Sequence, residues 1–186
     1  MRLRLTIILL TLLSCNDRQK SETKTLDFKY FTIDVPVTWE HVKAQGIDSF
    51  VGHLTLDNGD TIMFDLGWYS NSLDEEYKFK IENGDVYVKN EKESTSNSTL
   101  FEFYGKADTV DIEKFKMNKI QWTTIDGKRA KIVQPRETGK GMTGIYFDSL
   151  WTAGSGTDRF QMNGTNLHPD NETRLLQAFE TLKFKQ

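Results

Sequence analysis

The sequence predicts an α+β fold, an antiparallel sheet with helices packed against it. Three observations indicate this class. Apolar and polar residues alternate in several short stretches, which is typical of half-buried strands. The pairs Asn58-Gly59 and Asp126-Gly127 mark turns between such stretches. Near the end of the chain, apolar residues recur at helical spacing and predict a helix with one buried face: Leu175, Leu176, Phe179 and Leu182.

The first fifteen residues have the layout of a secretory signal. Two arginines precede an apolar run over 5–13, and a small residue, Ser14, stands before Cys15. The run is only about half of the ~20 apolar residues that a membrane-spanning helix needs. The segment 12–15 (Leu-Leu-Ser-Cys) resembles the bacterial lipobox, which implies cleavage before Cys15 and lipidation of that residue. The alternative is an ordinary cleaved signal that leaves a free cysteine.

We therefore expect a lipoprotein signal over 1–14, a flexible tether over 15–25 and a single domain over 26–186. Residues 16–24 are polar and charged, with almost no apolar surface to bury. The remaining chain is long enough for one domain with its own core. Cys15 is the only cysteine, so the domain is expected to have no disulfide and no cysteine-based metal site.

Strands at 50–56 and 62–68 are expected to pair as a hairpin. Partners across a hairpin share a face, so a two-residue turn at Asn58-Gly59 would place the two apolar rows on opposite faces. A three-residue loop over 57–59, with its glycine left-handed, brings both rows together. Leu54 then lies opposite Ile62.

The middle of the chain predicts two helices. Ser72 and Glu75 form a capping box, which predicts a short helix with Leu73, Tyr77 and Ile81 on one face. Asp108 and Asp111 are expected to cap a second helix that carries Val110 and Phe115. Further strands are expected at 31–35 (ended by Pro36), 85–89, 100–104, around 145–147 and around 160–162, with a polar loop at 90–99.

The turn length of the second hairpin, at Asp126-Gly127, is predicted in the same way from its apolar residues. Ile120 and Trp122 are expected to share a buried face with Ala130 and Ile132, which requires a three-residue loop over 125–127. The opposite face then collects a basic cluster: Lys119, Arg129 and Lys131, extended by Arg136 and Lys140.

The last helix is expected to begin at Pro169 and Asp170. Proline fits the first turn of a helix, and an acidic residue suits its positive end. After this helix, Phe184 is expected to return to the sheet.

Composition and motifs exclude several function classes. The chain has 24 basic and 27 acidic residues, the wrong balance for binding nucleic acid through its phosphates. The Gly139-Lys140-Gly141 segment lacks the spacing and the hydroxyl residue of a phosphate-binding loop. His41, His53 and His168 are scattered, without metal-ligand spacing, so no metal and no cofactor are expected.

Three sets of residues are candidates for function. His53 and Asp65 are diagonal neighbours on the outer face of the first hairpin, and they are the best general base and orienter for a hydrolase. A solvated hairpin face explains the same pair without chemistry. The basic cluster, with Arg129 and Arg136, suits an acidic partner or lipid headgroups. Trp68, with Tyr69 and Trp151, suits glycan stacking if these rings face the solvent.

The elements together resemble the PsbP-like family. The resemblance rests on the strand over 31–39 (Phe-Thr-Ile-Asp-Val-Pro-Val-Thr-Trp), the Asp126-Gly127-Lys-Arg-Ala130 hairpin and the closing helix that runs into 182–184. It covers residues 26–186 and implies a curved antiparallel sheet with helices packed on both faces, an α/β/α sandwich. Members of the family mostly bind and assist assemblies, and similar domains occur in envelope lipoproteins of Gram-negative bacteria.

The sequence thus predicts a periplasm-facing lipoprotein, anchored through Cys15, that binds a protein partner in the cell envelope without catalysis. The possible binding residues are His53, Asp65, Trp68, Arg129 and Arg136. A hydrolase that uses His53 and Asp65 and a carbohydrate-binding lipoprotein are the alternatives. The sequence does not distinguish the inner from the outer membrane, and it names no small-molecule or glycan ligand.

Overall fold

The computed structural model of the 186-residue chain describes residues 22–90, 92–93, 98–154 and 156–185. Strands account for 54% of the described residues, in three antiparallel sheets, and the described part holds one short α-helix, α1 (Pro169–Phe179). The predicted α/β/α sandwich, the architecture of the PsbP-like resemblance, is therefore wrong. Neither segment expected to form a helix in the middle of the chain does so, and α1 is left to pack on one face only.

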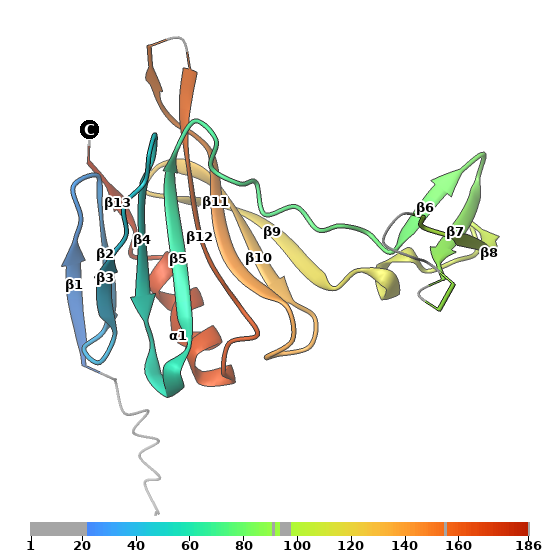
Figure 1. Cartoon of the computed structure of the whole chain (residues 1–186), viewed down its shortest axis with the longest axis horizontal. Helices are drawn as coiled ribbons and strands as arrows, with labels where there is room; N and C mark the ends of the chain where they lie inside the picture. Colours follow the sequence, from blue (N-terminus) through green and yellow to red (C-terminus); the bar gives the residue numbers. More distant parts are fainter. Residues whose placement is uncertain (1–21, 91, 94–97, 155, 186) are drawn as a thin grey trace, which may run out of the picture.

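The largest sheet has seven strands in the order β3-β4-β5-β12-β11-β10-β9 (Figure 1). Its strands are β3 (Glu40–Lys43), β4 (Phe50–Thr55), β5 (Thr61–Gly67), β9 (Asn118–Ile125), β10 (Lys128–Pro135), β11 (Met142–Ala153) and β12 (Gly156–Thr165). A second sheet joins β1 (Thr23–Asp27), β2 (Phe31–Pro36) and β13 (Lys183–Phe184). The third joins β6 (Phe79–Glu82), β7 (Asp85–Lys89) and β8 (Phe101–Lys106).

The core lies between the seven-stranded sheet and a layer made of α1 and the β1-β2-β13 sheet. We call the covered side of the large sheet its inner face and the opposite side its outer face. Phe31 of β2 is fully buried, and its ring packs against Phe64 and Phe160 of the inner face at centroid distances of 5.2 and 4.9 Å. Leu175 and Phe179 of α1 are fully buried in the same cluster. Burial of these side chains is the main force that holds the two layers together.

The first hairpin confirms the predicted register. Leu54 pairs with Ile62, and the loop is the three-residue 3₁₀ turn η1 (Asp57–Gly59). Asn58 and Gly59 both have positive φ, 59° and 78°. Both residue types enter this region at low cost, so the turn needs no strained side chain.

The C-terminal elements also follow the prediction. Pro169 begins α1, and His168 caps it by accepting from the backbone N–H of Asp170. Phe184 returns as β13 and pairs with β2. One boundary differs at the other end of the domain: β1 begins at Thr23, inside the stretch expected to be a tether.

Residues 68–117 form an arm that projects from the main body and carries the β6-β7-β8 sheet (Figure 1). The predicted capping box is wrong, because Ser72 bonds to Asp74 and Leu73 adopts φ 55°, which a helix does not allow. The second predicted helix is reduced to one 3₁₀ turn, η2 (Ile112–Phe115), whose cap is Asp111 as expected. The arm has a small aromatic core of its own: Tyr77, Phe79, Tyr104 and Phe115.

We expect Phe31→Ala to lower the free energy of unfolding by about 3–5 kcal/mol, because it opens a cavity among the four aromatic rings that pack against Phe31. Phe103→Ala is the matched control. Phe103 lies on the arm and is 60% exposed, so the same truncation there should cost under about 1 kcal/mol. Urea denaturation of both variants measures the difference. Equal losses would show that the aromatic layer contact is not what stabilises the domain.

Candidate binding groove along the edge strand β9

Strand β9 forms one free edge of the seven-stranded sheet, and its hairpin with β10 sets its orientation. The predicted three-residue loop is wrong: the turn has two residues, Asp126 and Gly127, and Ile125 pairs with Lys128. Both turn residues have positive φ, 51° and 71°, as a type I′ turn requires. This turn shifts the register by one residue, which moves every side chain of β9 to the face opposite the predicted one.

The inner face of β9 is therefore polar and its outer face apolar. Gln121 and Thr123 share the inner face with Ala130 and Ile132 of β10. Ile120 and Trp122, which we expected to be buried, lie on the outer face and are 42% and 45% exposed. The predicted basic cluster is divided as a result, since Lys119 lies on the inner face and Arg129 and Lys131 on the outer.

The backbone of β9 presents unpaired groups along the open edge. The carbonyl of Met117 accepts the N–H of Arg136, so the odd-numbered residues from Lys119 to Ile125 point their backbone groups toward β10. The N–H and C=O groups of Ile120, Trp122 and Thr124 point the other way, and no described residue bonds to them. At the start of the strand, the outward N–H of Asn118 donates a hydrogen bond to the Glu75 carboxylate of the arm, at 3.0 Å.

The two edges of the large sheet differ in protection. Natural edges are usually short, charged or interrupted by proline, because a free edge can pair with another chain. The opposite edge, β3, has four residues, which begin with Glu40 and end with Lys43. β9 has eight residues, no proline and one charge, Lys119. Of the two, β9 is the edge open to strand addition.

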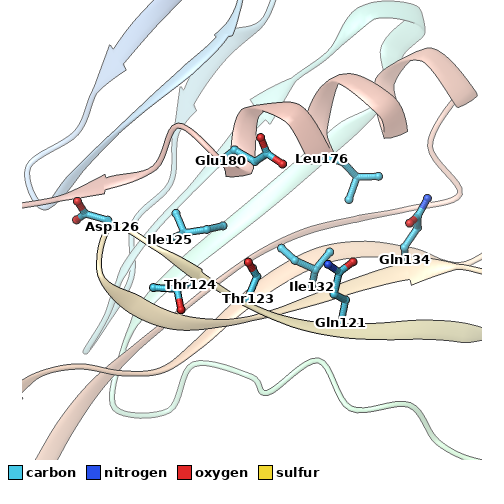
Figure 2. Close-up of a pocket in the computed structure, with 9 residues that line it drawn as sticks. All are labelled: Gln121, Thr123, Thr124, Ile125, Asp126, Ile132, Gln134, Leu176 and Glu180. Carbon is cyan, nitrogen blue, oxygen red and sulfur yellow. The ribbon is translucent and has the colours of Figure 1, made fainter.

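A pocket opens beside this edge on the inner face, with a volume of about 430 Å³. This size falls within the range of ligand pockets, about 300–1,000 Å³. Figure 2 shows Leu176 and Glu180, in and just after α1, facing the strands across it. The lining residues are Gln121, Thr123, Thr124, Ile125, Asp126, Ile132, Gln134, Leu176 and Glu180. They include two carboxylates, two side-chain amides and no basic residue.

Residues outside the pocket hold two of the lining side chains, Gln134 and Asp126, in place. Gln134 donates to Glu172 at 3.4 Å, and Glu172, which is 2% exposed, also accepts the N–H of Gly139 at 3.0 Å. Asp126 accepts the N–H of Phe184 at 2.9 Å, and Lys183 lies 3.6 Å from its other oxygen. Glu180 has no such ion pair with any residue of the described chain. Gln134 and Asp126 are thus held in place before any ligand binds, and Glu180 is still available.

The outer side of the same edge carries an aromatic residue with a cation. The guanidinium of Arg129 lies 3.8 Å from the ring centre of Trp122, a cation–π contact. The Asp148 carboxylate forms an ion pair with the same arginine, with 3.6 Å between the nitrogen and the oxygen. Arg136 instead pairs with Glu113 of the arm at 2.5 Å. The two arginines predicted as binding residues are therefore already engaged, and only Arg129 lies beside β9.

Lys131 is buried under the arm. Its side chain is 5% exposed, donates to Asp74 at 2.7 Å and lies over the Tyr146 ring at 5.4 Å. The hydrogen bond from Lys131 holds the pKa of Asp74 below its usual value. This contact fastens the arm to the outer face next to Trp122, the pairing partner of Lys131 on β9.

The structure does not assemble the predicted hydrolase pair. His53 and Asp65 lie on the outer face as diagonal neighbours, as expected, but no hydrogen bond joins them. Burial raises the pKa of Asp65, partly offset by a hydrogen bond with Ser49. One Asp65 oxygen is buried without a partner. The carboxyl therefore lacks the geometry of an orienter for His53.

The aromatic residues predicted for glycan binding differ in exposure. Trp68 and Tyr69 are 42% and 80% exposed, which meets the condition for two of the three rings. Trp151 is half-buried, packs against Phe184 and donates its indole N–H to Asp158. Glycan binding at Trp68 stays a prediction.

Cys15, the predicted lipidation site, lies outside the described residues. Within the described ranges, no helix is long and apolar enough to cross a membrane, and no cluster of three or more metal-ligand side chains is present. The sequence patterns used above could not reveal the pocket, because its two walls are more than forty residues apart in the chain.

Comparison with known proteins found no matching protein-family model, no matching curated protein and no matching solved structure.

The Asp74–Lys131 contact predicts a pH-dependent stability. A lowered folded-state pKa means that the bond stabilises the fold fully above the unfolded value of 3.8 and less as the pH falls below it. We expect Asp74→Asn to cost about 1–1.5 kcal/mol near neutral pH, because it weakens the bond to buried Lys131 although solvent screens the exposed carboxylate, and this deficit shrinks toward about pH 2.5.

Urea unfolding curves at both pH values measure this deficit. Asp148→Asn, which removes an exposed ion pair, is the control and should cost under about 1 kcal/mol. A deficit that does not change with pH would contradict the assignment.

Proposed function

We propose that this chain is a lipid-anchored, non-catalytic binding module of the cell envelope that captures an extended segment of a partner protein by strand addition to β9. One observation carries the proposal: an unprotected edge strand lies directly beside a pocket lined by preorganised polar groups. In strand addition, main-chain hydrogen bonds supply affinity, and pockets for alternate side chains supply specificity. β9 offers both within one strand.

The geometry suits an extended peptide better than a small molecule alone. A strand added to β9 would bond to the outward N–H and C=O groups of Ile120, Trp122 and Thr124. Its side chains would alternate between the two faces. Those on the inner side would enter the pocket next to Gln121 and Thr123, and those on the outer side would cover the exposed Trp122 ring.

The non-catalytic part of the proposal rests on the composition of the groove. The residues that line the pocket include no histidine, cysteine or lysine. Two threonine hydroxyls and two carboxylates do line it, but no hydrogen bond among these described residues joins either hydroxyl to either carboxylate, so no hydroxyl is paired with a base there. Amides, hydroxyls and carboxylates on an apolar floor are the usual means of holding a ligand in one orientation.

The anchor sets where the partner segment must lie. In the sequence, β1 begins eight positions after Cys15. An extended chain spans at most about 3.3–3.6 Å per residue, so the start of β1 stays within about 30 Å of the membrane surface that holds the lipid. The captured segment therefore belongs to an envelope protein that reaches this layer.

The test uses a proline that blocks the edge without breaking the hairpin. Ile120 points its N–H outward, so Ile120→Pro removes a free donor and leaves the bonds to β10 in place. We expect a heptapeptide selected from a display library on the full chain to bind this variant at least about tenfold more weakly. Ile120→Ala keeps the N–H and is the matched control, with a loss of less than about threefold.

Fluorescence anisotropy measures binding, and circular dichroism confirms that both variants are folded. Equal binding by Ile120→Pro and Ile120→Ala would contradict strand addition at β9. So would failure to select any peptide. A dimer of the parent chain that Ile120→Pro dissociates would show that a second copy occupies the edge instead.

A further inference from the structure

We infer that the pocket beside β9 receives a lysine or arginine side chain of the captured segment. The inference rests on the proposed function, since it names the class of residue that the groove selects. Three features of the pocket point to a long basic side chain: the charge of its lining, the position of the helix end and the apolar floor between them.

The charge of the lining is negative. Asp126 and Glu180 are the two charged residues that contribute to the pocket, and no basic residue lines it. Asp126 is already bonded to the N–H of Phe184 and lies 3.6 Å from Lys183. Glu180 has no ion pair with a described residue, so its carboxylate is free to bind a cation. A guanidinium or ammonium group is the side-chain chemistry that matches it.

The end of α1 reinforces this charge. α1 ends at Phe179, and Glu180 is its C-cap. The C-terminal end of a helix carries a partial negative charge of about half an elementary unit, which favours cations nearby. The last turn of α1 contains no basic residue of its own. The negative end of the helix therefore lies next to the pocket without an internal counter-charge.

The floor of the pocket fits the aliphatic stem of such a side chain. Ile132 of β10 and Leu176 of α1 lie on opposite walls (Figure 2), and both are only partly buried. Lysine and arginine commonly lay their methylene groups along apolar surface and keep the charged end at a polar group. Gln121 and Thr123 add oxygen acceptors at the entrance for N–H donors.

Other side chains fit this pocket poorly. An acidic side chain would face two carboxylates and no cation among the lining residues, which costs free energy through like-charge repulsion. A large aromatic ring would cover Glu180 and remove its carboxylate from water without a hydrogen-bond partner. A short apolar side chain would leave the acidic end of the pocket unfilled.

The test uses a set of fluorescein-labelled heptapeptides, Thr-Val-Thr-X-Thr-Val-Thr, bound to the full chain and measured by fluorescence anisotropy. X is lysine, arginine, norleucine, phenylalanine or glutamate. We expect the lysine and arginine peptides to bind about three- to fivefold more tightly than the norleucine peptide, which has the stem without the charge, because Glu180 is exposed and solvent screens its ion pair. The glutamate peptide should bind most weakly.

Two variants connect this preference to Glu180. Glu180→Gln should abolish the advantage of lysine over norleucine and leave the norleucine peptide unaffected. Glu180→Lys should reverse the order, so that the glutamate peptide binds more tightly than the lysine peptide. Asp170→Asn, at the other end of α1 and exposed, is the control and should leave the preference unchanged.

The outcomes separate this inference from the proposed function. Equal binding of all five peptides, lost in Ile120→Pro, would overturn the basic specificity and keep strand addition. Tightest binding of the phenylalanine peptide would overturn it as well and identify an apolar pocket. No binding by any peptide, charged or neutral, would overturn both.

Discussion

The two-residue turn at Asp126 and Gly127 is the constraint on which the candidate site depends. Both residues have left-handed backbone conformations, which aspartate tolerates and glycine adopts at no steric cost. The turn fixes the register of β9 against β10, and with it the face on which every β9 side chain lies. A loop one residue longer would bury Trp122 and turn Gln121 and Thr123 away from the pocket.

The same turn joins the hairpin to the C-terminal elements. The carboxylate of Asp126 accepts the N–H of Phe184, so the tip of the hairpin is fastened to β13. Phe184 in turn packs its ring against Phe147 and Phe160 of the inner face at centroid distances of 4.8 and 5.4 Å. The two walls of the pocket, one from the β9-β10 hairpin and one from α1, are thereby held at a fixed separation by the core.

Sequence patterns predicted the parts of the fold that local chemistry decides. Strands β2, β7 and β8, the 57–59 loop and α1 with its proline start follow directly from alternation, turn residues and helical spacing. The capping box at Ser72 failed because Leu73 and Asp74 have partners outside their own segment: Leu73 packs beside Val133 and Tyr146, and Asp74 bonds Lys131. Such tertiary contacts override local helix signals.

The site itself was not predicted, for a related reason. The turn length of each hairpin was predicted by placing the apolar residues of both strands on one buried face. This reasoning succeeded at Asn58-Gly59. It failed for β9, because Ile120 and Trp122 do not lie in the core. Alternating apolar residues that are exposed on an edge strand can contribute to a binding surface. In the sequence they look the same as a row of buried residues. The pocket needs Leu176 and Glu180, which no pattern in the hairpin indicates.

Amide hydrogen exchange along β9 tests the central claim, an open backbone edge that a partner strand closes, most directly. In the free chain, the account predicts fast exchange at Ile120, Trp122 and Thr124 and slow exchange at Gln121 and Thr123, whose N–H groups bond to β10. Saturating Thr-Val-Thr-Lys-Thr-Val-Thr peptide should slow the three outward amides by about tenfold or more and leave the others unchanged. Outward amides that are already protected, or that stay fast when the peptide is bound, would contradict the account.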